Sequence, residues 1–230
     1  MRQGLPLIEF PEETLDWERI FPVCRPVAVE VGSGKGRFLI RAAESDRGTN
    51  WCGLEVRWAH LALGVERIVN RGLDNACYVR CDAMEVVRRF LAPRSVGAFH
   101  VYYPDPWWKK RHRKRRVFSP GFIADLARAL APGGELRVAT DVQEYFEEIA
   151  SLVVMSGLFE PRALPEELWS PQGDPLTSYE AKYIQRGRQP NRAAFSRTET
   201  PAPAPEPWVS RRPRPAPLAS LLLAPRTHRR

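Results

Sequence analysis

The chain has 230 residues, 43% of them hydrophobic, with a formal net charge of +8 at pH 7. This length suits one domain of about 200 residues plus an extension. No stretch approaches the roughly 18 apolar residues of a membrane span, and the four cysteines fit no metal-binding spacing. We therefore expect a soluble, cytoplasmic protein that holds no metal and does not bind membranes.

The positive charge is concentrated in two segments. Residues 109–116 carry +7 and residues 201–230 carry +5, which leaves −4 on the rest of the chain. A polyanion should therefore dock at one place rather than over the whole surface. We expect residues 1–25 to form an arm or short helix and residues 26–200 to form the domain. Residues 201–230 form a Pro/Ala/Arg-rich tail that should be disordered, and it either adds phosphate contacts or is inert.

The domain begins with a strand at 26–31, a glycine turn at 32–36 and a helix at 37–43. Glycines let the backbone pass close to a ligand, so Gly32 and Gly34 are candidate cofactor-binding residues. The G-x-G-x-G spacing is shorter than the dinucleotide fingerprint G-x-G-x-x-G. Glu30, just before the turn, would repel a pyrophosphate but suits a ligand with an ammonium group, such as S-adenosylmethionine.

The next two strands also end close to acids. Strand 51–55 ends in Glu55, nineteen residues past Gly36, which is about the spacing at which an acid meets ribose hydroxyls. The alternative is a solvent-exposed acid at the end of a strand. Strand 76–79 leads to Asp82, which can accept a hydrogen bond from an adenine amine, and a helix at 84–91 follows. Between these strands, helix 57–71 is predicted to bury Leu61, Val65, Ile68 and Val69 on one face.

A fourth strand, residues 97–103, leads into Pro104-Asp-Pro-Trp-Trp-Lys-Lys-Arg-His-Arg-Lys-Arg-Arg116. Prolines on both sides of Asp105 restrict the backbone and remove two amide donors. Aromatic faces beside a basic run are suited to stacking a base and holding its phosphates. Asp105 is therefore predicted to read a base next to a patch that binds a polynucleotide backbone.

The remaining elements continue the alternation. Ser119 and Pro120 open a helix to about residue 131, a turn at 132–134 leads to strand 135–141, and an amphipathic helix spans 143–155. Residues 158–176 read as a loop. Thr177 caps a helix that continues to residue 187, and residues 191–197 form a possible last strand.

Strands alternating with helices predict an α/β fold, in which a mostly parallel sheet is covered by helices on both faces and binds its ligands along one edge. A single acid at the end of a strand is commonplace, whereas a row of them suggests a site. The acids expected along that edge are Glu30, Glu55, Asp82, Asp105 and Asp141.

These motifs together resemble the bacterial tRNA guanine-N7 methyltransferases, which are class I S-adenosylmethionine-dependent enzymes with a Rossmann-like sheet. The resemblance covers residues 27–197 and is most specific in the Pro104–Trp107 loop with its basic run. It implies transfer of a methyl group from S-adenosylmethionine to N7 of a guanosine in the variable loop of tRNA. One departure is Trp108, which stands where the family usually has a proline. The matching segments are 30–36, 53–55, 82–83, 104–107, 109–112, 140–141 and 177–180.

The resemblance also implies roles for individual residues. Asp105 is expected at the catalytic centre and, with Glu30, Glu55 and Asp82, in the cofactor site. The substrate is expected to be held by Lys109, Asp141, Thr177, Ser178, Tyr179 and Glu180. The RNA-contacting stretch is expected to comprise Arg111, His112, Arg113, Lys114, Arg115 and Arg116.

Guanine N7 is an exposed lone pair, so methylation there needs positioning and desolvation rather than a strong base. A carboxylate that accepts from guanine N1–H and the exocyclic amine would fix the ring, and either Asp105 or Glu180 can supply it.

Three alternatives are a nicotinamide-dependent oxidoreductase, a non-catalytic RNA-binding protein, and a methyltransferase acting on a small molecule or another RNA. The glycine spacing and Glu30 argue against the first, the presence of every candidate acid argues against the second, and the basic loop disfavours a small molecule. The oligomeric state, monomer or homodimer, stays open.

Overall fold

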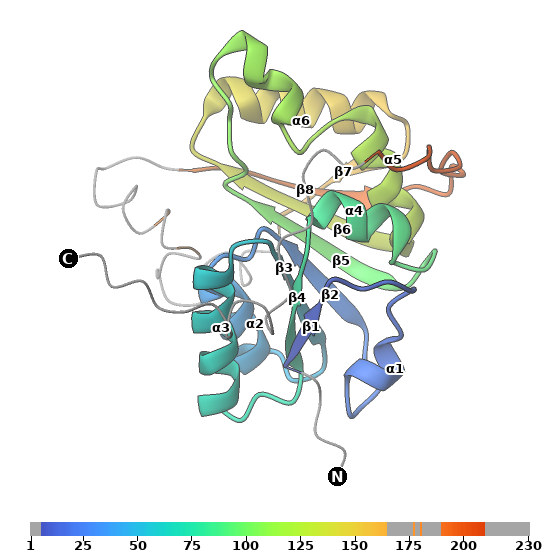
Figure 1. The fold of residues 1–230 in the computed structure, drawn as a ribbon. Helices are drawn as coiled ribbons and strands as arrows, with labels where there is room; N and C mark the ends of the chain where they lie inside the picture. The colour runs from blue at the N-terminus through green and yellow to red at the C-terminus, as the bar shows by residue number, and fades with distance from the viewer. Residues whose placement is uncertain (1–5, 165–176, 178–179, 181–189, 210–230) are drawn as a thin grey trace, which may run out of the picture.

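The computed structural model describes residues 6–164, 177, 180 and 190–209. Its centre is an eight-stranded sheet with the order β1-β4-β3-β2-β5-β6-β8-β7 (Figure 1). Neighbouring strands from β1 to β6 pair in parallel, and β8 runs antiparallel to both β6 and β7. The strands are β1 (Leu7–Glu9), β2 (Val27–Val31), β3 (Asn50–Glu55), β4 (Ala76–Arg80), β5 (Val96–Tyr102), β6 (Leu130–Thr140), β7 (Phe159–Arg162) and β8 (Asn191–Arg197).

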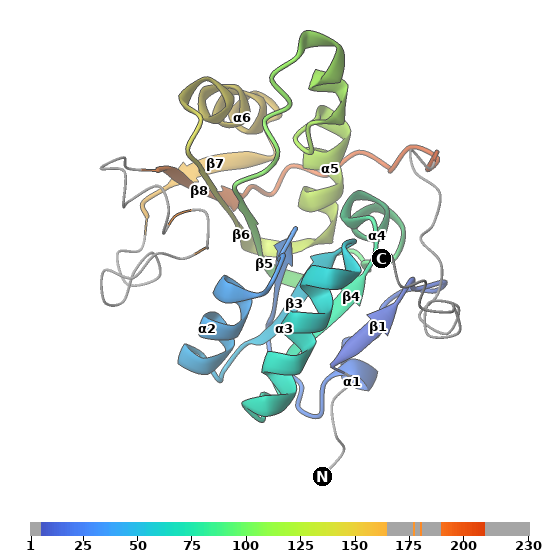
Figure 2. The same cartoon turned by 60° about the vertical axis from the view of Figure 1, so that its left-hand side comes forward.

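Helices cover both faces of the sheet. Figure 2 shows α2 and α3 on one face and α4, α5 and α6 on the other. Among the described residues, none of the helices has the length and apolar character that crossing a membrane requires. The helices are α1 (Trp17–Ile20), α2 (Arg37–Ser45), α3 (Trp58–Asn70), α4 (Ala83–Arg89), α5 (Pro120–Ala129), α6 (Gln143–Met155) and the 3-10 helix η1 (Lys110–Arg115).

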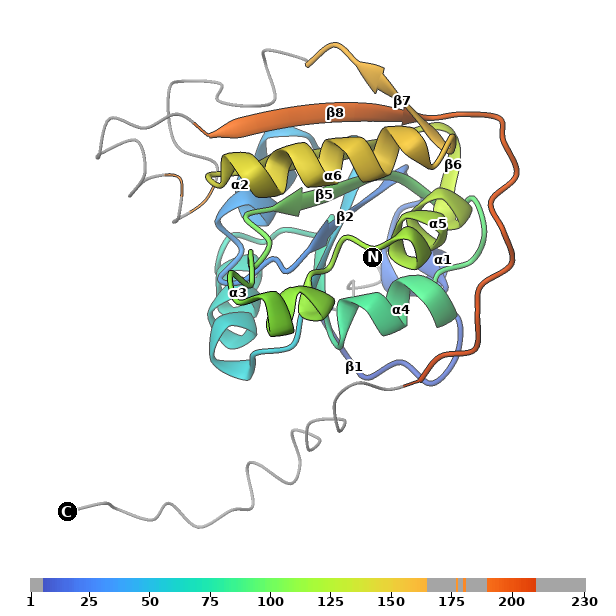
Figure 3. The ribbon, with the colours of Figure 1, turned by 90° about the horizontal axis from the view of Figure 1, so that it is seen from above.

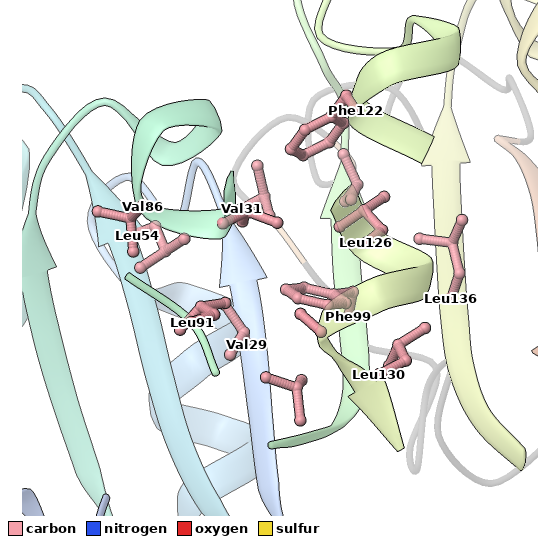
Figure 4. Packing of buried hydrophobic residues seen from close by; sticks show 14 of the residues in the cluster. Val29, Val31, Leu54, Val86, Leu91, Phe99, Phe122, Leu126, Leu130 and Leu136 are labelled. Atoms are coloured by element: carbon pink, nitrogen blue, oxygen red, sulfur yellow. The ribbon is translucent and has the colours of Figure 1, made fainter. Parts of the chain in front are cut away.

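The central strands are buried on both faces, which explains why their sequences are apolar runs rather than alternating patterns. In β2, Val29 and Val31 belong to the core beneath α4, α5 and α6. Glu30, between them, points to the opposite face because successive side chains of a strand alternate. Figure 4 shows Phe122 and Leu126 of α5 and Phe99 of β5 among the side chains of the larger core.

Most elements predicted from the sequence are present. Helix α6 and strand β8 have the predicted bounds, and most of the others begin and end within a few residues of theirs. The predicted helix 177–187 lies outside the described residues except at positions 177 and 180. Helix α5 begins as expected, with Pro120 in its first turn and the Ser119 hydroxyl accepting a hydrogen bond from the Phe122 N–H at 3.3 Å. The predicted mostly parallel α/β sheet with helices on both faces is confirmed.

Four details differ from the prediction. The N-terminal arm contributes strand β1, and the expected loop after residue 158 contains strand β7. Both strands are too short for a periodic signal, and they form by pairing with existing neighbours. Residues 132–134 lie inside β6 at a register shift rather than in a separate turn. Val69, expected in the α3 core, is 61% exposed because the helix turns it away from the sheet.

Residues 201–209 contain no helix or strand, yet they lie against the domain. Ala202 packs on the larger core, and the Arg88 guanidinium lies 5.7 Å from the Trp208 ring. Figure 3 shows this segment continuing from β8 along the side of the molecule. The rest of the predicted tail, residues 210–230, is outside the described residues, and so are Ser178 and Tyr179.

Candidate active site

The candidate residues follow neighbouring strands whose carboxyl ends meet at one edge of the sheet. Val31 of β2 pairs with Leu54 of β3 on one side and with Val101 of β5 on the other. Tyr102 of β5 pairs in turn with Ala139 of β6. The glycine turn after β2 therefore emerges between the end of β3 and the loop after β5, which is where open parallel sheets bind ligands.

The glycine turn borders open space. Gly32, Gly34 and Gly36 have φ angles of 74°, 54° and 73°, in the region that favours glycine. A Cβ atom added to Gly32 or Gly34 would meet no atom within 4 Å, whereas one on Gly36 would lie 2.2 Å from Tyr78 Oη. The first two glycines can therefore admit a ligand, while the third is required for packing.

Glu55 braces this turn from the end of β3. Its Oε2 accepts a hydrogen bond from the Gly34 N–H at 2.9 Å, and its Oε1 accepts one from the Arg57 N–H at 2.7 Å. The Glu55 side chain is buried, and both of its hydrogen bonds are part-buried. The carboxylate is thus fixed at the strand edge, and the alternative of a freely exposed acid is wrong.

Glu30 is a buried acid with an unpaired oxygen. The residue is 3% exposed, and its Oε2 has no hydrogen-bond partner among the described residues. Burial raises its pKa well above the usual range, a backbone hydrogen bond with Leu39 partly opposes this, and the negative charge of Glu55 adds to the rise. A cationic ligand beside the glycine turn would offset both the burial of the Glu30 charge and its repulsion by Glu55.

Asp82 follows β4 and caps α4. Its Oδ1 accepts a hydrogen bond from the Met84 N–H at 3.0 Å, and the side chain is half-buried. The backbone N–H of Cys81, just before it, donates to the Glu55 carbonyl at 3.1 Å. The ends of β3 and β4 are therefore joined, and Asp82 lies on the same edge as Glu55.

The loop after β5 is held in a strained backbone conformation. Tyr103 and Trp107, on either side of the Pro-Asp-Pro segment, have φ angles of 51° and 42°, which non-glycine residues rarely adopt. Such outliers persist only where the surroundings fix them, and they cluster at functional sites. Asp105 is exposed between them and makes no hydrogen bond or ion pair with a described residue.

Asp105 and Glu30 share the sheet edge but do not contact each other. Glu30 lies on the α2 face, whereas Asp105 is near Tyr145 of α6. Burial raises the pKa of Tyr145 to about 12, and the charges of Arg116, Glu148 and Asp105 also act on its hydroxyl. The Asp105 loop thus borders the α6 side of the edge.

The basic run after this loop divides into exposed and buried residues. Lys109, Arg111, Arg113, Lys114 and Arg115 are exposed, and His112 is half-exposed. Trp107 packs within the segment, with the Arg115 guanidinium 5.0 Å from its ring and the His112 ring 5.8 Å away. Trp108 is 64% exposed. These side chains form a cationic surface with an available aromatic face.

Arg116 is a correction to the predicted RNA-contacting stretch. It is 6% exposed, and its Nε donates to the Pro106 carbonyl at 2.7 Å. Its guanidinium also pairs with Glu148 and lies 4.4 Å from the Tyr145 ring. Burial against α6 removes this arginine from the surface that nucleic acid could reach.

Glu180 lies on the Glu30 side of the edge. Its backbone N–H donates to Thr177 Oγ1 at 3.1 Å, as the predicted helix cap requires. Its buried carboxylate forms an ion pair with Arg192 of β8. Arg192 pairs in register with Ala139, which belongs to the core beneath α2 and α3. Burial raises the pKa of Tyr102 on the same face, and the charges of Arg137, Glu30, Glu180 and Arg192 also act on its hydroxyl. Asp141, half-buried after β6, completes the row of acids.

Curated relatives of this chain are named as tRNA methyltransferases. A family model described as a putative methyltransferase matches residues 24–193. The tRNA (guanine-N(7)-)-methyltransferase of Bordetella pertussis is 36% identical over 182 residues, which cover 78% of this chain and 70% of that protein. The tRNA (guanine-N(7)-)-methyltransferase of Chromobacterium violaceum is 34% identical over 191 residues, covering 81% and 83%. This chain belongs to the tRNA (guanine-N(7)-)-methyltransferase family.

Solved structures extend the similarity to the fold. The 16S rRNA methyltransferase KamB has a TM-score of 0.57 and 20% identity, covering 86% of this chain and 99% of that one. An antibiotic-related methyltransferase also has a TM-score of 0.57, with 18% identity and coverage of 81% and 96%. This member of the tRNA (guanine-N(7)-)-methyltransferase family thus has the Rossmann-like methyltransferase sheet that its sequence predicts.

Sequence reasoning missed a buried polar group beneath the site of this methyltransferase. His100 Nδ1 and Tyr102 Oη lie 2.8 Å apart, and Glu30 pairs in register with His100. Burial, followed by the charge of Arg137, lowers the pKa of His100 well below its usual value. A histidine in the middle of an apolar strand is the sequence feature that could have pointed to this buried group. No sequence feature points to Arg192 as the partner of Glu180.

Proposed function

We propose that this protein transfers a methyl group from S-adenosylmethionine to N7 of a guanosine in tRNA, forming 7-methylguanosine in the cytoplasm. The observation that carries the proposal is the shared strand edge. There, the glycine turn and Glu30, whose Oε2 has no hydrogen-bond partner among the described residues, lie on the same edge as the strained Asp105 loop and its exposed cations. The names of the similar proteins support the same reaction.

The residues present fit S-adenosylmethionine as the cofactor. Glu30 offers an unpaired oxygen to a cationic group, and Gly32 and Gly34 leave room for the ligand. Glu55 would accept from the ribose hydroxyls, and Asp82 would accept from the adenine amine. When bound, this cofactor supplies an electrophilic methyl group on a sulfonium.

Asp105 is favoured over Glu180 as the group that holds the guanine edge. The Glu180 carboxylate is buried and already paired with Arg192, whereas Asp105 is exposed and has no partner among the described residues. Asp105 would accept from guanine N1–H and the exocyclic amine and so fix the ring. Because N7 carries no proton, no residue has to remove one. The carboxylate would also stabilise the positive charge that the purine acquires.

The tRNA backbone would bind along the exposed cations that follow this loop. Lys109, Arg111, Arg113, Lys114 and Arg115 lie on one short segment directly after Trp108, whose exposed ring can stack on a base. Asp141 and Thr177 lie beside the same edge and are proposed to contact the substrate. Ser178 and Tyr179 are proposed with them on the family resemblance alone.

The test is to incubate the full chain with unfractionated tRNA and methyl-labelled S-adenosylmethionine, and then to identify the methylated nucleoside by mass spectrometry. We expect 7-methylguanosine at one position of the variable loop. Methyl transfer to an exocyclic amine, or transfer to ribosomal RNA but not to tRNA, would contradict the proposal.

A further inference from the structure

The buried arginine at the end of the basic run joins three parts of the candidate site. The Arg116 guanidinium contacts the Pro106 carbonyl through Nε and the Glu148 carboxylate of α6 through a second nitrogen. It also lies over the Tyr145 ring, and its own N–H closes the end of η1 by donating to the Arg113 carbonyl at 2.9 Å. The Asp105 loop, η1 and α6 are therefore fixed to one another through a single residue, by its side chain to the loop and α6 and by its backbone N–H to η1.

The loop needs such a fixed support because its backbone is strained. The positive φ angles of Tyr103 and Trp107 enclose the loop at both ends. At the first end, the Tyr103 N–H donates to the Ala139 carbonyl of β6 at 2.7 Å. At the second end, the bond from Arg116 to Pro106 is the matching anchor. Without it, the loop could relax toward ordinary backbone angles and displace Asp105.

The sequence offers a matched comparison within the same segment. Arg113 and Arg116 are both arginines, three residues apart, but Arg113 is exposed and Arg116 is buried. An exposed arginine can neutralise a phosphate, whereas a buried one whose guanidinium is bonded to a carbonyl and a carboxylate cannot. Arg113 should therefore affect tRNA binding, and Arg116 should affect the rate of methyl transfer.

On the basis of the proposed function, we propose that Arg116 is a positioning residue that holds the Asp105 loop in its working geometry and does not contact tRNA. A misplacement of about 1 Å near a reacting group can slow a reaction by about 10²-fold. We therefore expect Arg116→Gln to lower kcat by that order. Its tRNA affinity and the salt dependence of that affinity should stay near those of the wild type.

The experiment measures kcat, KM for tRNA, and the tRNA dissociation constant across a salt series for wild type, Arg116→Gln, Arg116→Lys and Arg113→Gln. Arg113→Gln should show the opposite pattern, with weaker tRNA binding and a salt slope shallower by about 0.7–0.9. Arg116→Lys should recover part of kcat, because it keeps a cation near Glu148 but cannot make all the contacts of the guanidinium.

A second variant covers the case in which Arg116→Gln does not fold. Glu148 is only partly buried, so Glu148→Gln should fold and should lower kcat in the same direction by a smaller factor. Where Arg116→Gln folds, adding Glu148→Gln to it should cost little more, because the two residues act through one contact.

Wild-type kcat in either variant would overturn the inference. So would a loss in Arg116→Gln that appears as weaker tRNA binding with a shallower salt slope. The activity of the wild type shows whether the role of Arg116 or the proposed function itself is wrong. If the wild type does not form 7-methylguanosine, the proposed function fails. If it does and these patterns are absent, only the role of Arg116 fails.

Discussion

Replacing Glu55 by Gln should loosen the glycine turn and weaken cofactor binding together. A Gln side chain keeps one oxygen acceptor, so it can satisfy the Gly34 N–H or the Arg57 N–H but not both. Both bonds are only part-buried, so losing one of them costs about 0.5–1.5 kcal/mol. A domain of this size loses about 2–4 °C of Tm per kcal/mol, so we expect Tm to fall by roughly 1–6 °C.

The same change removes the negative charge proposed to face the ribose hydroxyls. Hydrogen bonds to charged groups contribute about 1.5–3 kcal/mol, which corresponds to about a 10- to 100-fold rise in Kd for S-adenosylmethionine. Calorimetric titration measures this Kd, and a thermal melt without ligand measures Tm. Glu44→Gln is the matched control, because Glu44 is an exposed acid paired with Arg71 and should change Tm little. A Glu55→Gln protein with wild-type Tm and wild-type Kd would refute the assignment.

Two further predictions concern the buried acid and the basic segment. The pKa of Glu30 is raised in the folded state, so stability without ligand should fall as pH rises above its ordinary value of 4.5. Glu30→Gln should therefore have a higher Tm than the wild type at pH 7 and a flatter Tm profile above pH 4.5, while binding S-adenosylmethionine more weakly; a lower Tm would contradict this. Replacing Arg113, Lys114 and Arg115 together by Gln should reduce the salt slope of tRNA binding by about 2–3, and an unchanged slope would show that the segment is only a solvated surface.

The sequence predicts those site residues whose chemical type and whose position near the end of a strand indicate the same role. Glu30, Glu55 and Asp82 lie at or near the ends of apolar runs, and parallel strands bring such positions to one edge. The Asp105 loop is recognisable because prolines and tryptophans leave few other interpretations. These features depend on local pattern, which a single sequence carries.

The remainder depends on tertiary packing that local pattern does not encode. In the sequence, Arg116 is one of seven Lys and Arg residues among the eight residues 109–116. Its burial depends on contacts with Pro106 and with Tyr145 and Glu148 of α6, which the sequence does not reveal. The sequence leaves Asp105 and Glu180 as alternatives for holding guanine, and it does not reveal the ion pair of Glu180 with Arg192 of β8. Strands β1 and β7 are likewise defined by the neighbours with which they pair.

The central claim is that Asp105 holds the guanine ring at the strand edge where the cofactor binds. Asp105 is exposed and has no partner among the described residues, so Asp105→Ala should fold with the Tm of the wild type. The most direct measurement is the single-turnover rate of methyl transfer to tRNA by Asp105→Ala at saturating tRNA and S-adenosylmethionine. We predict that transfer is abolished while tRNA affinity is largely kept. Transfer at a rate near that of the wild type would contradict the account.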